Sequence, residues 1–347
     1  MIKAPYSDIR DMNLITGITG LLGTHIALEL LSRGEKVRGL IRENSSTDTL
    51  QRVFAYYGSS DLFYRIEWIT GDVLDVTSLV EATEGCTAVF HCAAVVSYHR
   101  LDRKAMYKIN VEGTINVVNA ALHHGNVRLV HISSTAAIGR TLHDQELDEN
   151  SEWKEGKNTT HYAITKHLSE IEVWRGVQEG LNAVIINSGF IIGPGDFGRS
   201  SAAMFQRIYR GVPFYPPGGT GFISASDVAR VSVELLAKEQ FGERFIAVAE
   251  NRSMKEVFSL VAAALGKPVP TKEVTMPMLW TALIGEQLRE WLTGKKALVT
   301  REIIRNMQGT HTFNNEKLKR ITGERFQSVE DAVKRSAQLF LELVRKN

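Results

Sequence analysis

Cysteine is scarce in this chain, and its scarcity excludes two kinds of site. Only Cys86 and Cys92 occur among the 347 residues, six positions apart. A disulfide framework needs more cysteines, and a tetrahedral zinc site needs more ligands at a different spacing. We therefore expect both cysteines to be reduced, small apolar residues.

Long hydrophobic runs are also absent. The most apolar late stretch, residues 276–292, is interrupted by four polar side chains, Glu286, Gln287, Arg289 and Glu290. That stretch is too polar to span a bilayer. The first 13 residues have no apolar segment behind a basic start, so nothing in them indicates export. These absences predict a cytoplasmic protein without a transmembrane segment.

Neither sign of charge dominates, because the formal net charge is only +2. Such a balance gives no broad attraction for a polyanion, so nucleic acid is not an expected partner. The ten histidines include no pair at metal-ligand spacing with a nearby acid, so no metal site is predicted.

What the chain does contain is an alternation of short β-branched runs with longer helical patterns over its first 190 residues. The runs at 13–16, 36–41, 66–70, 88–91, 128–133 and 183–187 are typical of strands, and helices are expected at 21–32, 102–124, 161–179 and 226–238. This alternation predicts an α/β fold of the Rossmann type, with a doubly wound parallel sheet.

A change of composition after residue 186 predicts a second, smaller and mainly helical substrate lobe. Residues 187–222 hold a quarter of the chain's aromatic residues in about a tenth of its length. We expect residues 1–186 plus 222–250 to form the Rossmann-type domain, and residues 187–221 plus 251–347 the substrate-binding lobe. A glycine-rich turn is expected at 218–221.

Three glycines between the first strand and the first helix predict a dinucleotide site. Gly17, Gly20 and Gly23 are spaced three and three. Such a turn delivers a diphosphate onto free backbone N–H groups at a helix N-terminus, and the third glycine lets the helix approach the strand. Thr19, Leu21 and Leu22 belong to the same cofactor-binding turn. The competing interpretation is an ordinary strand-to-helix turn.

Residues after the next two strands bear on which cofactor is bound. An acid after the second strand favours NAD(H), but this chain has Ile41 followed by Arg42, whose guanidinium can pair with a 2′-phosphate. NADP(H) is therefore favoured, with NAD(H) as the alternative. Asp72 and Val73 follow the third strand, where a carboxylate can accept from the adenine amino group; Asp72 can also be a turn or cap residue.

A tyrosine and a lysine four residues apart predict the catalytic acid. Tyr162 and Lys166 share one face of a helix, and a neighbouring ammonium is expected to lower the pKa of the phenol. Ser134 follows a strand whose carboxyl end points into the ligand crevice, so its hydroxyl can hold a substrate oxygen. Ser133 and Thr135 are the competing hydroxyls.

Together these motifs resemble the extended short-chain dehydrogenase/reductase superfamily, also called the NAD-dependent epimerase/dehydratase family. The chain looks most like its dihydroflavonol reductase and 3β-hydroxysteroid dehydrogenase branch. The resemblance covers about residues 13–250 and rests also on 89–94, 110–114, 193–196 and 226–229. It implies a Ser134, Tyr162, Lys166 triad and hydride transfer at a carbonyl or carbinol carbon. It further implies that Lys166 bonds the nicotinamide ribose, that Asn110 is a supporting polar residue, and that Ala93, Ala94 and Ser133 line the cofactor.

The chain departs from nucleotide-sugar enzymes of the same superfamily. Where those enzymes carry arginines for the substrate diphosphate, this chain has Asn187 and the neutral run 219–222. Arg199, Arg207, Arg210 and Arg301 are candidate substitutes.

We therefore expect an NADP(H)-linked oxidoreductase for an apolar, cyclic small molecule. A nucleotide-sugar epimerase or dehydratase with bound NAD is the alternative, and a non-catalytic dinucleotide sensor is a third hypothesis that the intact triad disfavours.

Two further features stay open at this point. His99 and Arg100 follow the fourth strand and are candidates for substrate contact. A stripe at helical spacing, which comprises Trp280, Leu283, Ile284, Leu288, Trp291 and Leu292, is interpreted as core, lid, dimer contact or membrane-surface face. A homodimer is compatible with the sequence.

Overall fold

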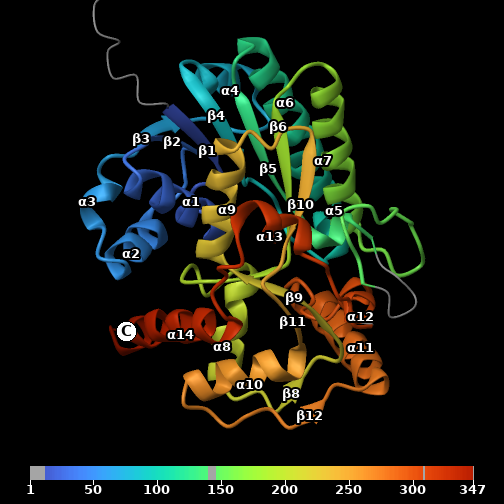
Figure 1. The fold of residues 1–347 in the computed structure, drawn as a ribbon. Coiled ribbons are helices and arrows are strands. Elements are labelled where there is room, and N and C mark those ends of the chain that lie inside the picture. The colour runs from blue at the N-terminus through green and yellow to red at the C-terminus, as the bar shows by residue number, and fades with distance from the viewer. Residues whose placement is uncertain (1–11, 140–145, 308, 347) are drawn as a thin grey trace, which may run out of the picture.

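A seven-stranded parallel sheet forms the centre of the computed structural model, which describes residues 12–139, 146–307 and 309–346. The strand order is β10-β6-β5-β4-β1-β2-β3 (Figure 1). Its members are β1 (Met12–Thr16), β2 (Lys36–Ile41), β3 (Glu67–Thr70), β4 (Cys86–His91), β5 (Arg128–Ser134), β6 (Ala183–Ser188) and β10 (Glu243–Ala247). The predicted Rossmann-type fold is confirmed, and chain order reverses between β1 and β4, where such sheets bind ligands.

Helices cover both faces of this sheet. One face carries α1 (Leu21–Ser32), α2 (Asp48–Tyr56), α3 (Ser60–Phe63) and α9 (Ala225–Ala237). The other carries α4 (Val76–Thr83), α6 (Gly113–His124) and α7 (His161–Gln178). Neighbouring strand residues alternate between the two cores: Val89 packs with the α4, α6 and α7 side, whereas Phe90 packs with the α1 and α9 side. Burial on both faces explains why the strands are apolar throughout.

The helix predicted at 102–124 is interrupted near its middle. It consists of α5 (Arg103–Tyr107), a π-helical turn η2 (Lys108–Glu112) and α6. Such a turn shifts the side chains that follow it relative to a regular helix, and it holds Asn110 in the interior.

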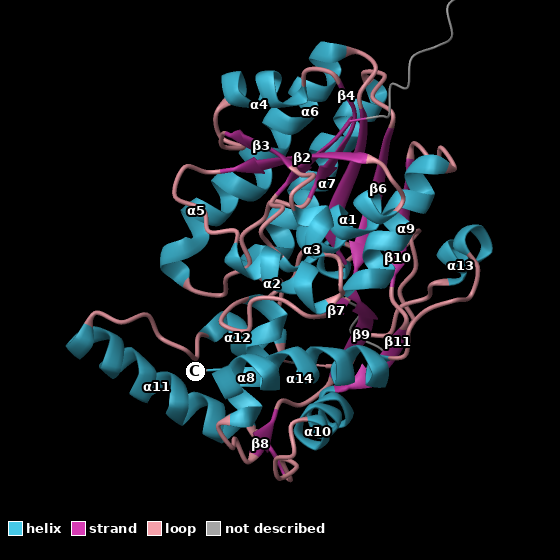
Figure 2. Cartoon of the chain, turned by 90° about the vertical axis from the view of Figure 1, so that its left-hand side faces the viewer, coloured by secondary structure: helices cyan, strands magenta, loops and turns pink. Residues whose placement is uncertain are grey.

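The smaller lobe lies beneath the sheet, at the carboxyl ends of its strands (Figures 1 and 2). It contains a three-stranded sheet of β7 (Phe190–Ile192), β9 (Gly219–Ser224) and β11 (Glu250–Ser253), and a pair formed by β8 (Phe214–Tyr215) and β12 (Lys272–Glu273). Its helices are α8 (Ala203–Tyr209), α10 (Met254–Ala264), α11 (Met276–Thr293), α12 (Arg301–Asn306) and α14 (Val329–Lys346). A further helix, α13 (Glu316–Thr322), packs on β10 and α9.

The turn expected at 218–221 is instead mostly a strand, β9, which pairs with β7 and β11. Glycine occurs there because of close packing. A Cβ atom on Gly221 would lie 2.5 Å from the Val248 side chain, and one on Gly219 would lie 2.7 Å from the carbonyl oxygen of Arg252. The glycine cluster therefore marks a crowded strand rather than a turn.

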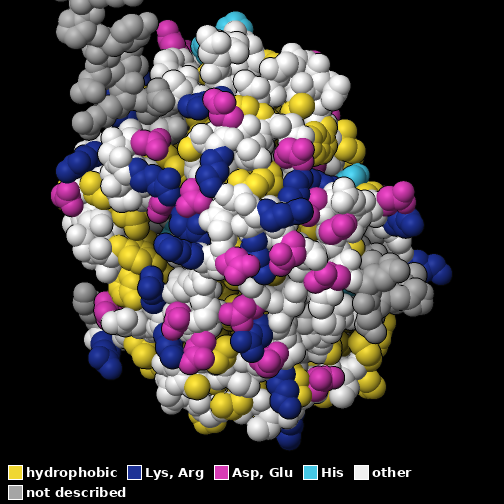
Figure 3. Space-filling view, in the orientation of Figure 1, with side chains coloured by type: hydrophobic (Ala, Val, Ile, Leu, Met, Phe, Trp, Pro, Cys, Tyr) yellow, Lys and Arg dark blue, Asp and Glu magenta, His cyan; other side chains and the backbone are white. Residues whose placement is uncertain are grey.

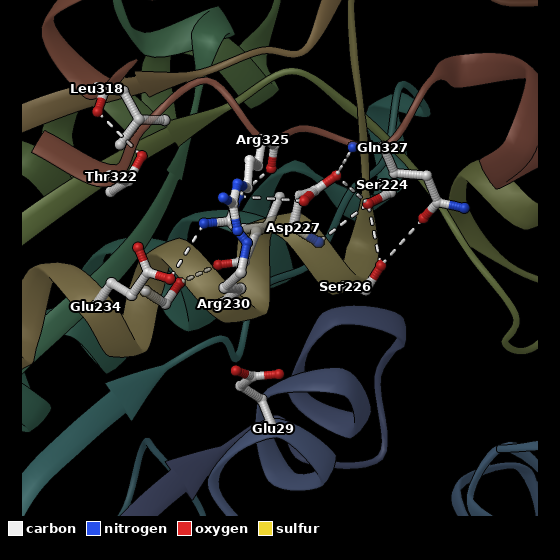
Figure 4. Close-up of polar contacts among 12 residues, drawn as sticks. Glu29, Ser224, Ser226, Asp227, Arg230, Glu234, Leu318, Thr322, Arg325 and Gln327 are labelled. Carbon is white, nitrogen blue, oxygen red and sulfur yellow. Dashed lines mark hydrogen bonds and ion pairs between the residues drawn. The ribbon is translucent and has the colours of Figure 1, made fainter. Parts of the chain in front are cut away.

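A buried acid ties the lobe to the sheet domain (Figure 4). Asp227, in the first turn of α9, accepts hydrogen bonds from the Ser224 hydroxyl at 2.7 Å and the Gln327 backbone N–H at 2.8 Å. Arg230 pairs with Asp227 at 3.3 Å and donates to the carbonyl oxygen of Arg325 at 2.7 Å. These contacts hold the segment that leads into α14 against α9.

Candidate active site

The glycine turn after β1 leaves the start of α1 without a side-chain cap. Gly17 has φ +70°, and a Cβ atom there would lie 2.7 Å from the backbone nitrogen of Ala93. A Cβ atom on Gly23 would lie 2.4 Å from the carbonyl oxygen of Gly17, so only glycine lets α1 approach the turn so closely. Gly20 is exposed at the N-cap. The first N–H groups of α1 thus remain free for an anionic ligand at the point where chain order reverses.

Around the glycines, side chains face in different directions. Leu22 is buried in the core, so only its backbone is available to a ligand. Thr19 and Leu21 are half-buried. Leu21 lies against Gly195, where a Cβ atom would come within 2.7 Å of its side chain.

After β2 the chain turns tightly through Arg42. The Ser45 backbone N–H donates to the carbonyl oxygen of Arg42 at 2.9 Å, and the Arg42 N–H donates to the Ser45 hydroxyl at 3.2 Å. The Arg42 guanidinium is exposed and forms no ion pair with any described residue. It is available for an external anion, and Ser45 is a hydroxyl beside it that the sequence alone did not suggest.

After β3, the competing interpretation of Asp72 as a turn residue agrees with its contacts. Its Oδ1 atom accepts from the Leu74 backbone N–H at 2.9 Å, while the other oxygen has no partner among the described residues. Val73 is buried, and its carbonyl oxygen accepts from Asn116 at 2.9 Å. The half-buried Asp72 therefore keeps one oxygen for a ligand.

After β4 the backbone is fixed by an amide clamp. Asn110 accepts from the Val95 N–H at 2.7 Å and donates to the Val95 carbonyl oxygen at 3.0 Å and to the Thr165 hydroxyl at 3.0 Å. It thereby joins the segment that follows Ala93 and Ala94 to α7. Ala93 is half-buried and Ala94 is exposed. Asn110 thus occupies a supporting position, as the family resemblance implies.

The two serines at the end of β5 have different surroundings. The hydroxyl of Ser133 is buried and donates to the carboxylate of Glu170. Ser134 is half-buried, and its oxygen accepts from the Ala136 N–H at 3.2 Å. The Ser134 side chain also lies near enough to Tyr162 to oppose the rise in the pKa of that phenol. The geometry therefore favours Ser134 over Ser133 as the hydroxyl that faces a substrate.

Below the serines lies a buried polar network that sequence reasoning missed. Glu170 accepts from Ser133 and from Asn187 at 2.5 Å, and Arg244 lies 3.7 Å from its other oxygen. All three partners are donors, as an ionised carboxylate requires. The sequence held one signal for Glu170: it follows Lys166 by four residues on α7, so the two side chains share a helix face.

Burial sets the protonation of Tyr162 and Lys166. The Lys166 ammonium donates to the carbonyl oxygen of Ile132 at 2.7 Å. Desolvation lowers the pKa of Lys166 to about 8, although the nearby Glu170 raises it. Desolvation raises the pKa of Tyr162, and the nearby Ser134 side chain opposes that shift.

The expectation that Lys166 lowers the pKa of Tyr162 was therefore wrong in sign. Removal from water disfavours a phenolate more than the neighbouring groups stabilise it. The ammonium is turned toward the backbone of β5 and does not contribute to the shift. Near neutral pH, Tyr162 consequently keeps its proton and is suited to donate it.

A cavity of about 510 Å³ lies between the segment after β4 and helices α11 and α12, and Tyr162 is not among the residues that line it. Tyr98 is in its wall and packs edge-on against Tyr162, with ring centroids 6.3 Å apart. His99 and Arg100 also line it, but His99 is paired with Glu290 at 2.9 Å.

The aromatic residues of the lobe mostly pack on one another instead of lining this cavity. Phe197, Phe205 and Phe222 are buried, and Phe197 packs on Phe205 and on Phe340 of α14. Within the described ranges, no group of three or more His, Cys, Asp or Glu side chains is arranged to hold a metal ion.

The predicted residues that the fold brings together fit a bound dinucleotide. The open helix start, the Arg42 guanidinium, the free Asp72 oxygen and the Tyr162/Lys166 pair all lie at carboxyl ends of neighbouring strands or on α7. An NAD(P) cofactor would be held by these groups, with its diphosphate on α1.

Comparison with known proteins agrees with this arrangement. The profile of the "NAD dependent epimerase/dehydratase family" matches residues 13–248. The chain is 32% identical over 281 residues to a putative dihydroflavonol 4-reductase of Synechocystis, a match covering 79% of this chain and 77% of that protein. It is also 32% identical over 263 residues to sterol demethylase protein B of Methylococcus capsulatus, covering 74% and 75% of the two chains.

Solved structures share the fold. The crystal structure of gox2253 superposes with a TM-score of 0.80 at 27% identity, covering 96% of this chain and 99% of that one. The dTDP-glucose 4,6-dehydratase DesIV of Streptomyces venezuelae, solved with NAD, gives a TM-score of 0.75 at 19% identity, covering 95% and 97% of the two chains. The chain belongs to the NAD-dependent epimerase/dehydratase family of extended short-chain dehydrogenases/reductases and is an NAD(P)-dependent oxidoreductase.

Proposed function

We propose that the protein interconverts a carbonyl and a secondary alcohol on an apolar, cyclic small molecule, with NADP(H) as cofactor and Tyr162 as proton donor and acceptor. The observation that carries the proposal is the half-buried Tyr162 phenol, which desolvation keeps protonated near Ser134, one helical turn from Lys166 on α7. Because burial keeps the phenol protonated, it can give its proton to a carbonyl oxygen during reduction.

The other triad members have separate tasks in this proposal. Ser134 holds the substrate oxygen next to the phenol. Lys166 holds the cofactor ribose and supplies positive charge near the oxygen that receives the proton. Glu170 opposes the effect of burial on Lys166 and so favours its charged form. The nicotinamide ring of a bound cofactor supplies or accepts the hydride.

Two observations support NADP(H) over NAD(H). The position after β2 holds the neutral Ile41 instead of an acid, and the exposed Arg42 has no acidic partner among the described residues. A 2′-phosphate could therefore pair with this guanidinium without competition.

The preference for an apolar substrate rests on the polar groups that are missing. Asn187 is committed to Glu170 and to the carbonyl oxygen of Ser134, and residues 219–222 form a neutral strand. Neither position offers a cation to a substrate diphosphate, whose burial without one costs several kcal/mol per charge. Several relatives are named for ring compounds, among them dihydroflavonol 4-reductase, anthocyanidin reductase and tetraketide alpha-pyrone reductase.

One observation favours the alternative, a nucleotide-sugar epimerase or dehydratase. The exposed Arg100 and Arg301 line the cavity next to Tyr98 and could serve a diphosphate from a different direction. The other candidate cations are less suited: Arg199 pairs with Asp196 at 3.4 Å, Arg210 lines a second cavity, and Arg207 is exposed on α8.

A competition experiment separates the two functions. The protein is mixed with NADPH and titrated with hydrophobic cyclic ketones and, in parallel, with a UDP-hexose, while nicotinamide absorbance is followed. We expect stoichiometric loss of NADPH with a ketone and weak binding of the UDP-hexose. Micromolar binding of the UDP-hexose, with turnover and no net change in absorbance, would replace the reductase by an epimerase.

A further inference from the structure

Helix α11 exposes a row of large apolar side chains to solvent. These side chains recur every three or four residues, which places them along one side of the helix, and they are 47% to 79% exposed. The α11 face comprises Trp280, Ile284, Leu288, Trp291 and Leu292. Figure 3 shows hydrophobic side chains gathered at the lower right of the molecule, where Figure 1 places α11.

The helix is anchored by its other side. Leu279 and Leu283 are buried and pack with Ile304 of α12 in a small separate cluster. The α11 face is the outward side of a helix whose inward side already packs on α12. It is therefore not part of the hydrophobic core. An exposed apolar surface of this size on a folded protein generally marks an interaction site.

The segments that pack around α11 carry an excess of positive charge. Segments 95–108 and 276–307 pack together around the 510 Å³ cavity, and they contain nine Lys and Arg residues against four Asp and Glu residues. Their excess of five positive charges exceeds the net charge of +2 of the whole chain. The remainder of the protein is therefore net negative, and the cationic charge is concentrated on the α11 side.

Ion pairing leaves mainly positive charges unpaired in these two segments. Each of the four acids has a basic partner: Glu286 with Arg289, Glu290 with His99, Glu302 with Arg103 and Asp102 with Lys296. Five exposed cations in the two segments lack an acidic partner among the described residues, namely Arg100, Lys104, Lys108, Lys295 and Arg301. In Figures 1 and 2, α5 and α11 lie on the same side of the molecule.

We propose that the α11 face docks the protein onto the surface of an anionic lipid bilayer. Tryptophan near both ends of an apolar helix face, with cations around it, is the composition of helices that lie in the membrane interface. None of the helices in the described ranges combines the length and apolar character needed to cross a bilayer, so the contact is peripheral.

A second copy of the chain fits this face less well. In a two-fold symmetric dimer the same patch meets itself, so the unpaired cations of both copies would be brought together. Anionic lipid headgroups instead complement them, and each cation near such a surface adds to binding.

The position of the face connects docking with catalysis. Leu283 and Gln287 of α11 line the cavity whose wall includes Tyr98, the ring that packs on Tyr162. Leu101, 65% exposed, lies at the same cavity. This part of the inference rests on the proposed function: an apolar substrate dissolved in the bilayer would enter beside Tyr162 without crossing water.

Vesicle flotation of the full chain tests the proposal. Vesicles of phosphatidylcholine alone are compared with vesicles that also contain phosphatidylglycerol, each at low and at high salt. We expect flotation with the anionic vesicles, weakened by salt, and a blue shift of tryptophan emission on binding. The double variant Leu288→Glu/Trp291→Glu should bind roughly tenfold more weakly or worse, and Lys295→Glu should lose mainly the salt-dependent part.

Matched controls keep the test decisive. Tyr64→Glu alters a side chain that is 75% exposed on the sheet domain, and it should float like the unaltered protein. The double variant should keep its melting temperature, its cofactor affinity and its turnover of a water-soluble cyclic ketone. Tyr162→Phe should lose turnover but still float, so failure of docking and failure of the proposed function are distinguishable.

Three results would overturn the proposal. In the first, the unaltered protein stays with the buffer at every lipid composition; in the second, the double variant floats as well as the unaltered protein. The third is a dimer without affinity for vesicles that the double variant converts to monomer, which would make the face a contact between copies.

Discussion

At the scale of single residues, α7 places three ionisable side chains on one face at four-residue intervals. Lys166 and Glu170 are buried and Tyr162 is half-buried, and withdrawal from water disfavours the charged form of each side chain. It raises the pKa of the phenol and lowers that of the ammonium to about 8. At neutral pH the phenol is therefore protonated and most of the lysine is still charged, the combination that carbonyl reduction requires.

Glu170→Gln should move the alkaline limb of the kcat/KM profile to lower pH. Glu170 raises the pKa of Lys166, so its removal lowers that pKa below about 8, and the lysine loses its charge earlier as pH rises. Thermal stability should also fall by about 1–3 kcal/mol, because Ser133 and Asn187 lose a charged acceptor. The measurement is a pH profile with an identified substrate.

Glu172→Gln is the matched control for this change. Glu172 lies on the same helix but pairs with Arg175 at 2.9 Å, away from the network. Its variant should keep the original alkaline limb. An unchanged limb in Glu170→Gln would refute the role assigned to this carboxylate.

Arg42→Ala should remove about 1–3 kcal/mol of the preference for NADPH over NADH, the range for a hydrogen bond to a charged group. The affinity for NADH should hardly change, because that cofactor has no 2′-phosphate. Calorimetry with both cofactors measures the ratio. Arg65→Ala, which alters an exposed arginine paired with Asp61, should leave the ratio intact. Equal affinities of the unaltered protein for the two cofactors would contradict the NADP(H) assignment.

Some residue-scale features were predictable and others were not. The Tyr162/Lys166 spacing is readable because helical periodicity is local. Ser134 was preferred from its place after the strand, with Ser133 as a competitor; adjacent strand residues point to opposite faces, and the position of Glu170 shows which face is filled. The sign of the Tyr162 shift was missed, since desolvation depends on residues far away in the chain.

At the scale of elements, strands were predicted well where β-branched residues are continuous and poorly where packing overrides composition. The six predicted strands of the large sheet occur within two residues of their expected ends. The strand β10 was not predicted, and the glycines of β9 indicated a turn because their reason lies in the side chains of Val248 and Phe313. Crowding of that kind leaves no local trace in the sequence.

Asp227→Ala tests the contact that fastens α9 to the segment before α14. The change removes the acceptor of the Ser224 hydroxyl and the Gln327 N–H, and it should cost about 1–3 kcal/mol of unfolding free energy. Chemical denaturation measures this loss. Glu234→Ala removes a partly exposed partner of Arg230 on the same helix and should cost less than about 1 kcal/mol. Equal losses of unfolding free energy in the two variants would show that the buried Asp227 contact stabilises the protein no more than the Glu234 contact.

At the scale of the whole molecule, three polar side-chain pairs connect segments that are far apart in the chain. The pairs of His99 with Glu290, Asp102 with Lys296 and Arg103 with Glu302 join the segment after β4 to α11, to the segment between α11 and α12, and to α12, almost 200 residues later in the chain. The sequence predicted a substrate lobe but not which of its residues meet the catalytic helix, because such long-range pairs follow from the assembled fold. Glu302 also accepts from the His161 N–H at the start of α7, at 3.3 Å.

Turnover by Tyr162→Phe, measured beside cofactor affinity, tests the central claim most directly. The substitution removes one hydroxyl from a half-buried ring and leaves the fold, Lys166 and the glycine turn in place. We predict that turnover of an identified ketone falls by a factor of about 100 or more, while NADPH binds as before. Near-normal turnover by the purified variant would contradict the assignment of Tyr162 as the proton donor.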